Sequence, residues 1–184
     1  MKIYMCGQFV KFLASKCHRL FTEFRDTHMR SYRINAFTIR VNLDASLRLP
    51  FPHATVEKRP YGSGWVEVQR IGEILFANGM EIASRVPDRQ RDDIQVHPNV
   101  LDALAEDYPD LIPRSLMVDE QGRTKYTFCR GATFRGEYHL YARYFCWNGE
   151  KLEQHCLRLD EERDDYLLSV WGARNPAFQL IDTR

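Results

Sequence analysis

Residues 138–159 read YHLYARYFCWNGEKLEQHCLRL, and this stretch decides the fold. Asn148-Gly149 divides it into two runs in which aromatic and aliphatic residues alternate with polar ones. Asn and Gly both tolerate the positive φ that a two-residue type I′ turn requires at its two central positions. The stretch therefore predicts a β-hairpin with a tight turn at Asn148-Gly149.

A second Asn-Gly pair extends this pattern towards the N-terminus. Asn78-Gly79 lies between two short apolar runs, at 74–77 and 80–83, and predicts another hairpin. Further strands are expected at 34–43, 54–58, 65–70 and 166–171. The strands at 54–58 and 65–70 flank a segment rich in Gly and Pro, and they are predicted to pair with each other. Asn175-Pro176 is predicted to open an irregular tail.

Two segments have helical periodicity. Apolar residues recur every three or four positions from Phe9 to Phe24, which predicts an N-terminal amphipathic helix at 8–25. A short middle helix is expected from Pro98, since proline suits the first helical turn, and it ends at Tyr108-Pro109. Strands joined by short turns favour antiparallel pairing. We therefore expect an α+β fold built mainly from β-hairpins.

Length and composition predict one folded domain spanning residues 1–184. The chain has 184 residues, 44% of them hydrophobic, which is enough for a full core. A formal net charge of +1 argues against an acidic nucleic-acid mimic and against a uniformly basic chromatin binder. The charge is uneven, however, because residues 1–48 contain nine Lys/Arg and three Asp/Glu.

The cysteines and acidic residues show no metal or redox motif. The five cysteines have no CxxC spacing, and so many unpaired thiols favour a reducing compartment. No run approaches the roughly 20 apolar residues of a membrane span, so we expect a soluble, cytoplasmic protein without a membrane partner. Asp92, Asp93 and Asp102 have no recognised ligand spacing with His53 or His97, and we expect no metal and no cofactor. His97 is interpreted instead as a helix-entry residue.

The hairpin at 138–159 also predicts two distinct faces. With a two-residue turn, Leu140 faces Leu157 on the side expected to cover the core. The opposite side carries His139, Tyr141 and Arg143 and is expected to be less buried. Under the plainest interpretation, that side is half covered, with Arg and Tyr stems packed and their polar tips in water.

A second interpretation of this face is a platform for single-stranded nucleic acid. Residues 122–144 contain five Lys/Arg and one acidic residue, interleaved with Tyr126, Phe128 and Phe134. Unpaired bases stack on sheet aromatics while cations follow the phosphates. The candidate binding residues are Arg123, Lys125, Arg130, Arg135, His139, Tyr141, Arg143 and Arg158.

A third interpretation is a small metal-independent ribonuclease. Glu137 would act as the base and His139 as the acid, while Arg143 and Arg158 would stabilise the developing phosphorane charge. Any long polar sheet face can produce such a set, so the residues alone do not fix the geometry.

We expect a non-enzymatic binding protein that contacts a protein or ribonucleoprotein partner. The sequence contains no GxGxxG, Walker-type, GxSxG or HExxH motif. Small motif-free domains with uneven surface charge include accessory, adaptor and inhibitor proteins, among them phage and plasmid counter-defence proteins of the anti-CRISPR kind. The nucleic-acid-binding protein and the ribonuclease remain the alternatives.

Overall fold

A computed structural model describes residues 29–85, 94–159 and 176–182. The predicted helix at 8–25 and the predicted strand at 166–171 lie outside these residues. The first strands are β1 (Ser31–Asn35), β2 (Thr38–Asn42), β3 (Thr55–Lys58), β4 (Trp65–Ile71), β5 (Ile74–Ala77) and β6 (Met80–Arg85). The helical segments are α2 (Pro98–Asp102), the π-helix η2 (Ala103–Asp107), the 3-10 helix η3 (Pro109–Leu111) and α3 (Arg114–Met117). The last strands are β7 (Tyr126–Arg135), β8 (Leu140–Trp147), β9 (Leu152–Arg158) and β10 (Ala177–Ile181).

The described strands form one ten-stranded sheet in the order β1-β2-β4-β5-β6-β10-β7-β8-β9, with β3 pairing with β7. Neighbouring strands are antiparallel, apart from β10, which is antiparallel to β6 and parallel to β7. The predicted α+β class with a mainly antiparallel sheet and a short middle helix is therefore confirmed. No helix within the described residues is long and apolar enough to cross a membrane.

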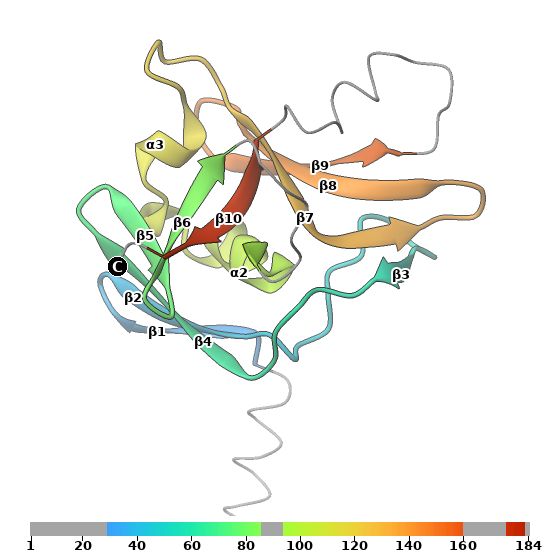
Figure 1. The fold of residues 1–184 in the computed structure, drawn as a ribbon, viewed down its shortest axis with the longest axis horizontal. Coiled ribbons are helices and arrows are strands. Elements are labelled where there is room, and N and C mark those ends of the chain that lie inside the picture. Colours follow the sequence, from blue (N-terminus) through green and yellow to red (C-terminus); the bar gives the residue numbers. More distant parts are fainter. Residues whose placement is uncertain (1–28, 86–93, 160–175, 183–184) are drawn as a thin grey trace, which may run out of the picture.

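The sheet curves around α2, so that strands lie on opposite sides of this helix (Figure 1). All five residues of α2 are buried. We call the side of the sheet that faces α2 the inner face and the other side the outer face. The core between helix and inner face contains Val96, Val100, Leu101, Leu104, Ile39, Val41, Val68, Leu75, Ile82, Phe145 and Phe178.

Local chemistry places the start of α2. His97 is the N-cap, with extended backbone, and its Nδ1 accepts a hydrogen bond of 3.1 Å from the backbone N–H of Asn99. Pro98 occupies the first turn, where a backbone N–H would have no partner within the helix, so the missing N–H of proline costs nothing there. The predicted role of His97 as a helix-entry residue is confirmed.

The Asn78-Gly79 turn is also confirmed. Asn78 has φ 47° and Gly79 has φ 79°, and Ala77 pairs directly with Met80. Both central residues thus adopt the positive φ of a two-residue type I′ turn.

The Asn148-Gly149 turn is different, and the predicted register was wrong. Only Gly149 has positive φ, and Trp147 pairs with Leu152 around a four-residue loop. Asn148 Oδ1 accepts bonds of 2.9 Å from the backbone N–H of both Glu150 and Lys151, which stabilises the longer loop. Leu157 consequently pairs with Ala142, two residues further along β8 than the predicted Leu140.

The predicted burial of the two hairpin faces was also wrong. The side that carries His139, Tyr141 and Arg143 is the inner face, where Arg143 is 0% and Phe145 is 1% exposed. A register shift of two residues keeps every side chain on its face, so the error lies in which face meets the core. α2 decides this, because its Asp102 carboxylate binds Arg143.

Three further strand predictions need correction. Residues 34–43 do not form one strand, because β1 and β2 pair as a hairpin around Ala36 and Phe37. β3 pairs with β7 and not with β4. The segment after Pro176, expected to be irregular, forms β10 inside the sheet. The pairing of β3 and the position of β10 depend on long-range contacts that local turn signals do not carry, whereas β1 and β2 form a local hairpin that the sequence pattern did not indicate.

A bulge of three residues interrupts β7 beside α2. Cys129 pairs with Arg143 and Thr133 pairs with the next residue back along β8, Ala142, so the three residues 130–132 have no partner in β8. At the centre of the bulge, a Cβ on Gly131 would lie 2.9 Å from the carbonyl oxygen of Val96. Glycine therefore lets the bulge approach the segment that leads into α2.

Candidate functional site

Arg143, which both the nucleic-acid and the ribonuclease hypotheses used, lies in the core. Its Nη1 donates to Asp102 Oδ1 at 2.8 Å and Oδ2 at 3.1 Å, and to Gln154 Oε1 at 3.0 Å. The guanidinium carbon lies 5.2 Å from the centre of the Phe134 ring. Arg143 therefore links β8 to α2 and is not accessible to a phosphate at the surface.

The other predicted catalytic residues lie near the turn between β7 and β8. His139 Nε2 is 3.3 Å from Arg158 Nη1, and Glu137 is exposed. A hydrogen bond to Glu137 raises the pKa of the Tyr138 phenol, and Tyr138 is 75% exposed. The structure brings His139 and Arg158 together, with Arg143 buried elsewhere.

The predicted basic residues do not form one surface. Arg130, like Arg143, is buried. Arg123 pairs with Asp119 at one end of β7, and Arg135 pairs with Glu57 at the other. β7 has ten residues, so these ends are separated by about 30 Å.

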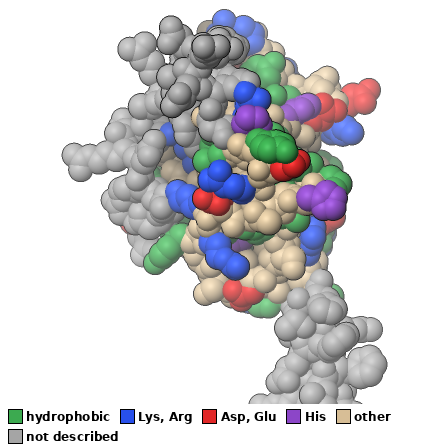
Figure 2. Space-filling model, turned by 90° about the vertical axis from the view of Figure 1, so that its right-hand side faces the viewer, with side chains coloured by type: hydrophobic (Ala, Val, Ile, Leu, Met, Phe, Trp, Pro, Cys, Tyr) green, Lys and Arg blue, Asp and Glu red, His purple; other side chains and the backbone are tan. Residues whose placement is uncertain are grey.

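Tyr141 and Lys125 are both held by neighbouring groups. The Tyr141 ring packs edge-on against Phe51 with centroids 4.9 Å apart, and Lys125 Nζ donates to the Ser115 carbonyl at 2.7 Å. The side of the molecule that carries β3 and the β7–β8 turn shows basic, acidic and His side chains intermixed (Figure 2). On this side, the described residues show no continuous basic track for a phosphate backbone.

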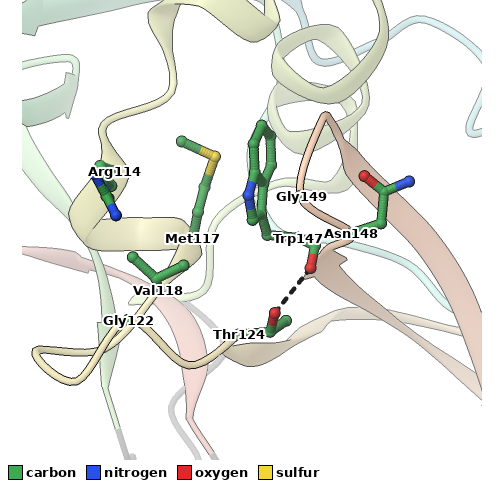
Figure 3. Close-up of a pocket in the computed structure, with 8 residues that line it drawn as sticks. All are labelled: Arg114, Met117, Val118, Gly122, Thr124, Trp147, Asn148 and Gly149. Atoms are coloured by element: carbon green, nitrogen blue, oxygen red, sulfur yellow. Dashed lines mark hydrogen bonds between the residues drawn. The ribbon is translucent and has the colours of Figure 1, made fainter.

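A groove of about 800 Å³ lies at the opposite end of β8 (Figure 3). Three chain segments enclose it: α3, the loop before β7, and the turn between β8 and β9. Its lining residues are Arg114, Met117, Val118, Gly122, Thr124, Trp147, Asn148 and Gly149. We call it the Trp147 groove.

The loop on one side of the groove is held by Asp119. Its Oδ1 accepts backbone N–H bonds from Gln121 at 2.9 Å and Arg123 at 2.8 Å, while Oδ2 accepts from Arg123 Nε at 2.7 Å. These bonds hold the carboxylate ionised and lower the pKa of Asp119. Gly122 supplies positive φ at 77°, and a β-bridge between Val118 and Thr124 closes the loop.

The other side of the groove is held by the turn after β8. Thr124 Oγ1 donates to the Trp147 carbonyl at 2.9 Å, which ties the loop to the hairpin. Asn148 uses its Oδ1 within the turn, and its Nδ2 donates to Glu153 Oε1 at 2.6 Å. Both walls are therefore fixed by hydrogen bonds rather than by packing alone.

The groove combines apolar surface with an available cation. The Trp147 indole, the Met117 thioether and Val118 provide apolar and aromatic contact surface (Figure 3). Arg114 is exposed, and no carboxylate among the described residues pairs with its guanidinium. The arrangement can hold an apolar side chain next to an acidic group.

The buried thiol and imidazole groups favour structural roles. Burial raises the pKa of Cys129 to about 11, so this thiol stays protonated and is a poor nucleophile. Burial, with the charge of Arg143, lowers the pKa of His97 to about 4, so the imidazole is neutral. Within the described ranges, no group of three or more His, Cys, Asp and Glu residues is arranged to hold a metal.

Sequence reasoning did not single out Trp147 or Arg114. Trp147 ends β8 next to a turn, and Arg114 follows Pro113 at the start of α3. Their proximity depends on the loop between α3 and β7, which the Val118–Thr124 bridge closes and the Thr124–Trp147 hydrogen bond ties to β8, and the sequence holds no periodic signal for it.

Comparison with models of protein families, with curated proteins and with solved structures found no significant match to this chain.

Proposed function

We propose that the protein is a non-enzymatic binding protein that holds a segment of a protein or ribonucleoprotein partner in the Trp147 groove. One observation carries this proposal: the Trp147 indole and the Arg114 guanidinium, which no described carboxylate neutralises, line the same open groove. Trp and Arg are the residues that most often dominate binding energy at protein interfaces.

The size and openness of the groove favour a segment over a small ligand. Sites for small molecules are clefts of roughly 300–1,000 Å³ that enclose most of the ligand. This groove has about 800 Å³ but is open to solvent. Its lining residues come from three separate segments of the chain (Figure 3). A side chain of a partner can enter it while the rest of the partner stays outside.

The chemistry of the lining defines the side chains that fit. An apolar or aromatic side chain would contact Trp147 and Met117, and a neighbouring Asp or Glu would pair with Arg114. The fixed walls lower the cost of binding, because no loop has to become ordered. Adaptors and inhibitors, including counter-defence proteins, act by holding a segment of a partner in this way.

The test is affinity capture of partners with variants of the groove. Trp147→Ala and Arg114→Glu should each lose the partner that the unaltered protein captures, and binding should weaken at least about tenfold because these residues are expected hot spots. Tyr61→Ala is the matched control, since Tyr61 is a 70% exposed aromatic residue outside the groove. Equal capture by all four proteins would contradict the proposal.

The ribonuclease hypothesis has less support from the structure. His139 and Arg158 are close enough for a joint role, but Arg143 is 0% exposed and bound to Asp102. Labelled single-stranded RNA should therefore stay intact on incubation with the purified protein. Cleavage that disappears in His139→Ala would overturn the proposal of a non-enzymatic role.

A further inference from the structure

A row of aromatic side chains crosses three strands on the outer face of the sheet. Phe128 in β7 pairs with Tyr144 in β8, and Tyr144 pairs with His155 in β9. The ring centroids are 5.7 Å apart for Phe128 and Tyr144 and 5.3 Å apart for Tyr144 and His155. Tyr126 adds a fourth ring, 6.2 Å from Tyr144.

The row lies on the side of the sheet away from α2. Side chains alternate along β8, and Arg143 and Phe145, on either side of Tyr144, point to the inner face. The aromatic row is therefore separated from Arg143 by the thickness of the sheet.

The rings of the row differ in exposure. Phe128 is 2% exposed, whereas Tyr126 is 58% exposed and the His155 side chain is 43% exposed. Among the described strands, β9 pairs only with β8, so His155 ends the row at an edge of the sheet. The Tyr144 and His155 rings are nearly parallel, with 22° between their planes, and another flat ring can continue the stack beyond His155.

The Glu153 carboxylate beside the row is surrounded by groups that reduce the effect of its negative charge. Glu153 accepts a hydrogen bond of 2.6 Å from Asn148 and lies 3.4 Å from His155 Nε2 and 4.0 Å from Lys151 Nζ. Its repulsion of a nearby phosphate is therefore reduced.

We propose that the Tyr126–Tyr144–His155 row is a stacking platform for unpaired bases of a single-stranded nucleic acid. Every base has an aromatic face, and bases splayed from a single strand stack on rings presented by a sheet. This function goes beyond the proposed protein binding and uses the outer face rather than the Trp147 groove. It keeps the sheet aromatics of β7 that the sequence suggested and adds Tyr144 and His155 in place of the dispersed basic residues.

The test is fluorescence anisotropy with labelled single-stranded oligonucleotides, oligo(dT) and oligo(rU), at low salt. His155→Ala and Tyr126→Ala should each weaken binding about tenfold, as expected for losing one stacking ring. His155→Phe keeps a flat ring and should retain the affinity. Tyr138→Ala, which removes a 75% exposed tyrosine next to the β7–β8 turn, should have no effect.

Salt dependence and strand type complete the test. Because few cations flank the row, affinity should fall only shallowly with salt, with a log–log slope near that of one or two phosphate contacts. A duplex competitor should displace the oligonucleotide poorly, since its bases are already stacked. Absence of binding at low salt, or binding that survives the ring variants and falls steeply with salt, would overturn this proposal and leave the groove proposal unaffected.

Discussion

Arg143 and Asp102, forty-one residues apart in sequence, form a buried ion pair in which Arg143 Nη1 lies 2.8 Å from Asp102 Oδ1. The Arg143 side chain is 0% exposed, and that of Asp102 is 8% exposed. Two other nitrogens of the guanidinium, Nε and Nη2, have no hydrogen-bond partner among the described residues. The pair therefore fixes α2 against β8 at a considerable cost in desolvation.

Removing one member of this pair should be more harmful than removing both. Arg143→Met leaves the Asp102 carboxylate buried and should lower the free energy of unfolding by about 3–5 kcal/mol. The double variant Arg143→Met/Asp102→Leu should recover most of that loss, because no uncompensated charge remains. Urea unfolding of Arg143→Met, Asp102→Leu and the double variant measures the coupling energy of the pair. Strictly additive losses would contradict this account.

The buried His97 predicts a dependence of stability on pH. Its pKa is lowered from 6.5 to about 4 in the folded state, so the unfolded chain binds the proton more readily. The stability that His97 contributes is therefore complete above pH 6.5 and is lost as the pH falls towards 4. The expected loss between pH 7 and pH 4 is about 3 kcal/mol from this group.

His97→Asn isolates that contribution. Asn is also a good N-cap, so the variant should keep α2 while removing the titrating group. Its unfolding free energy should fall less steeply between pH 7 and 4 than that of the unaltered protein. His53→Asn, at an exposed position, is the matched control variant. Equal slopes for all three proteins would refute the assignment.

The close approach of the β7 bulge to Val96 predicts intolerance of any side chain at position 131. In Gly131→Ala the new Cβ would meet the Val96 carbonyl oxygen at 2.9 Å, and backbone cannot move aside easily. The expected cost is about 2–3 kcal/mol, typical of overpacking. Gly79→Ala is the comparison, because it has φ 79° but no atom within 4 Å, and it should cost only about 1 kcal/mol. Thermal unfolding should give a lower melting temperature for Gly131→Ala than for Gly79→Ala. The opposite order would be inconsistent with the close contact.

The Asn148 side chain holds the turn after β8 through two hydrogen bonds to the backbone. Removing this side chain should lower the stability of the protein measurably. Asn148→Ala removes the acceptor for the N–H groups of Glu150 and Lys151 and should destabilise the protein by about 1–2 kcal/mol. Asn35→Ala removes a single such bond, to the N–H of Phe37, and should cost about half as much. Chemical denaturation compares the two. A larger loss for the Asn35 variant would argue against the four-residue loop.

The two Asn-Gly pairs show how far the sequence could predict the fold. Both pairs locate a chain reversal between strands, and both reversals are present. Only at Asn78-Gly79 do both residues adopt positive φ. At Asn148 the side chain instead bonds to the backbone of the loop, an alternative that the dipeptide allows equally well. Local sequence therefore gave the position of the second turn but not its length.

The candidate site was harder to predict because burial depends on partners far away in the chain. Arg143 has the pattern of an exposed polar residue on a strand, and only Asp102 on α2 makes its burial tolerable. The rings of the outer row were visible in sequence, but their alignment required the four-residue loop that pairs Tyr144 with His155. The Trp147 groove required the hydrogen bond between Thr124 and the Trp147 carbonyl, which no sequence pattern indicates.

The position of β10 has a consequence for how the protein is made. β10 lies between β6 and β7, and the nascent chain completes every other described strand before it. Until Ala177–Ile181 leave the ribosome, β6 keeps an open edge, β7 lacks its partner at Phe128, and the core lacks Phe178. The two parts of the sheet therefore cannot join until β10 has been synthesised. The time before β10 emerges is when the chain would most need a chaperone.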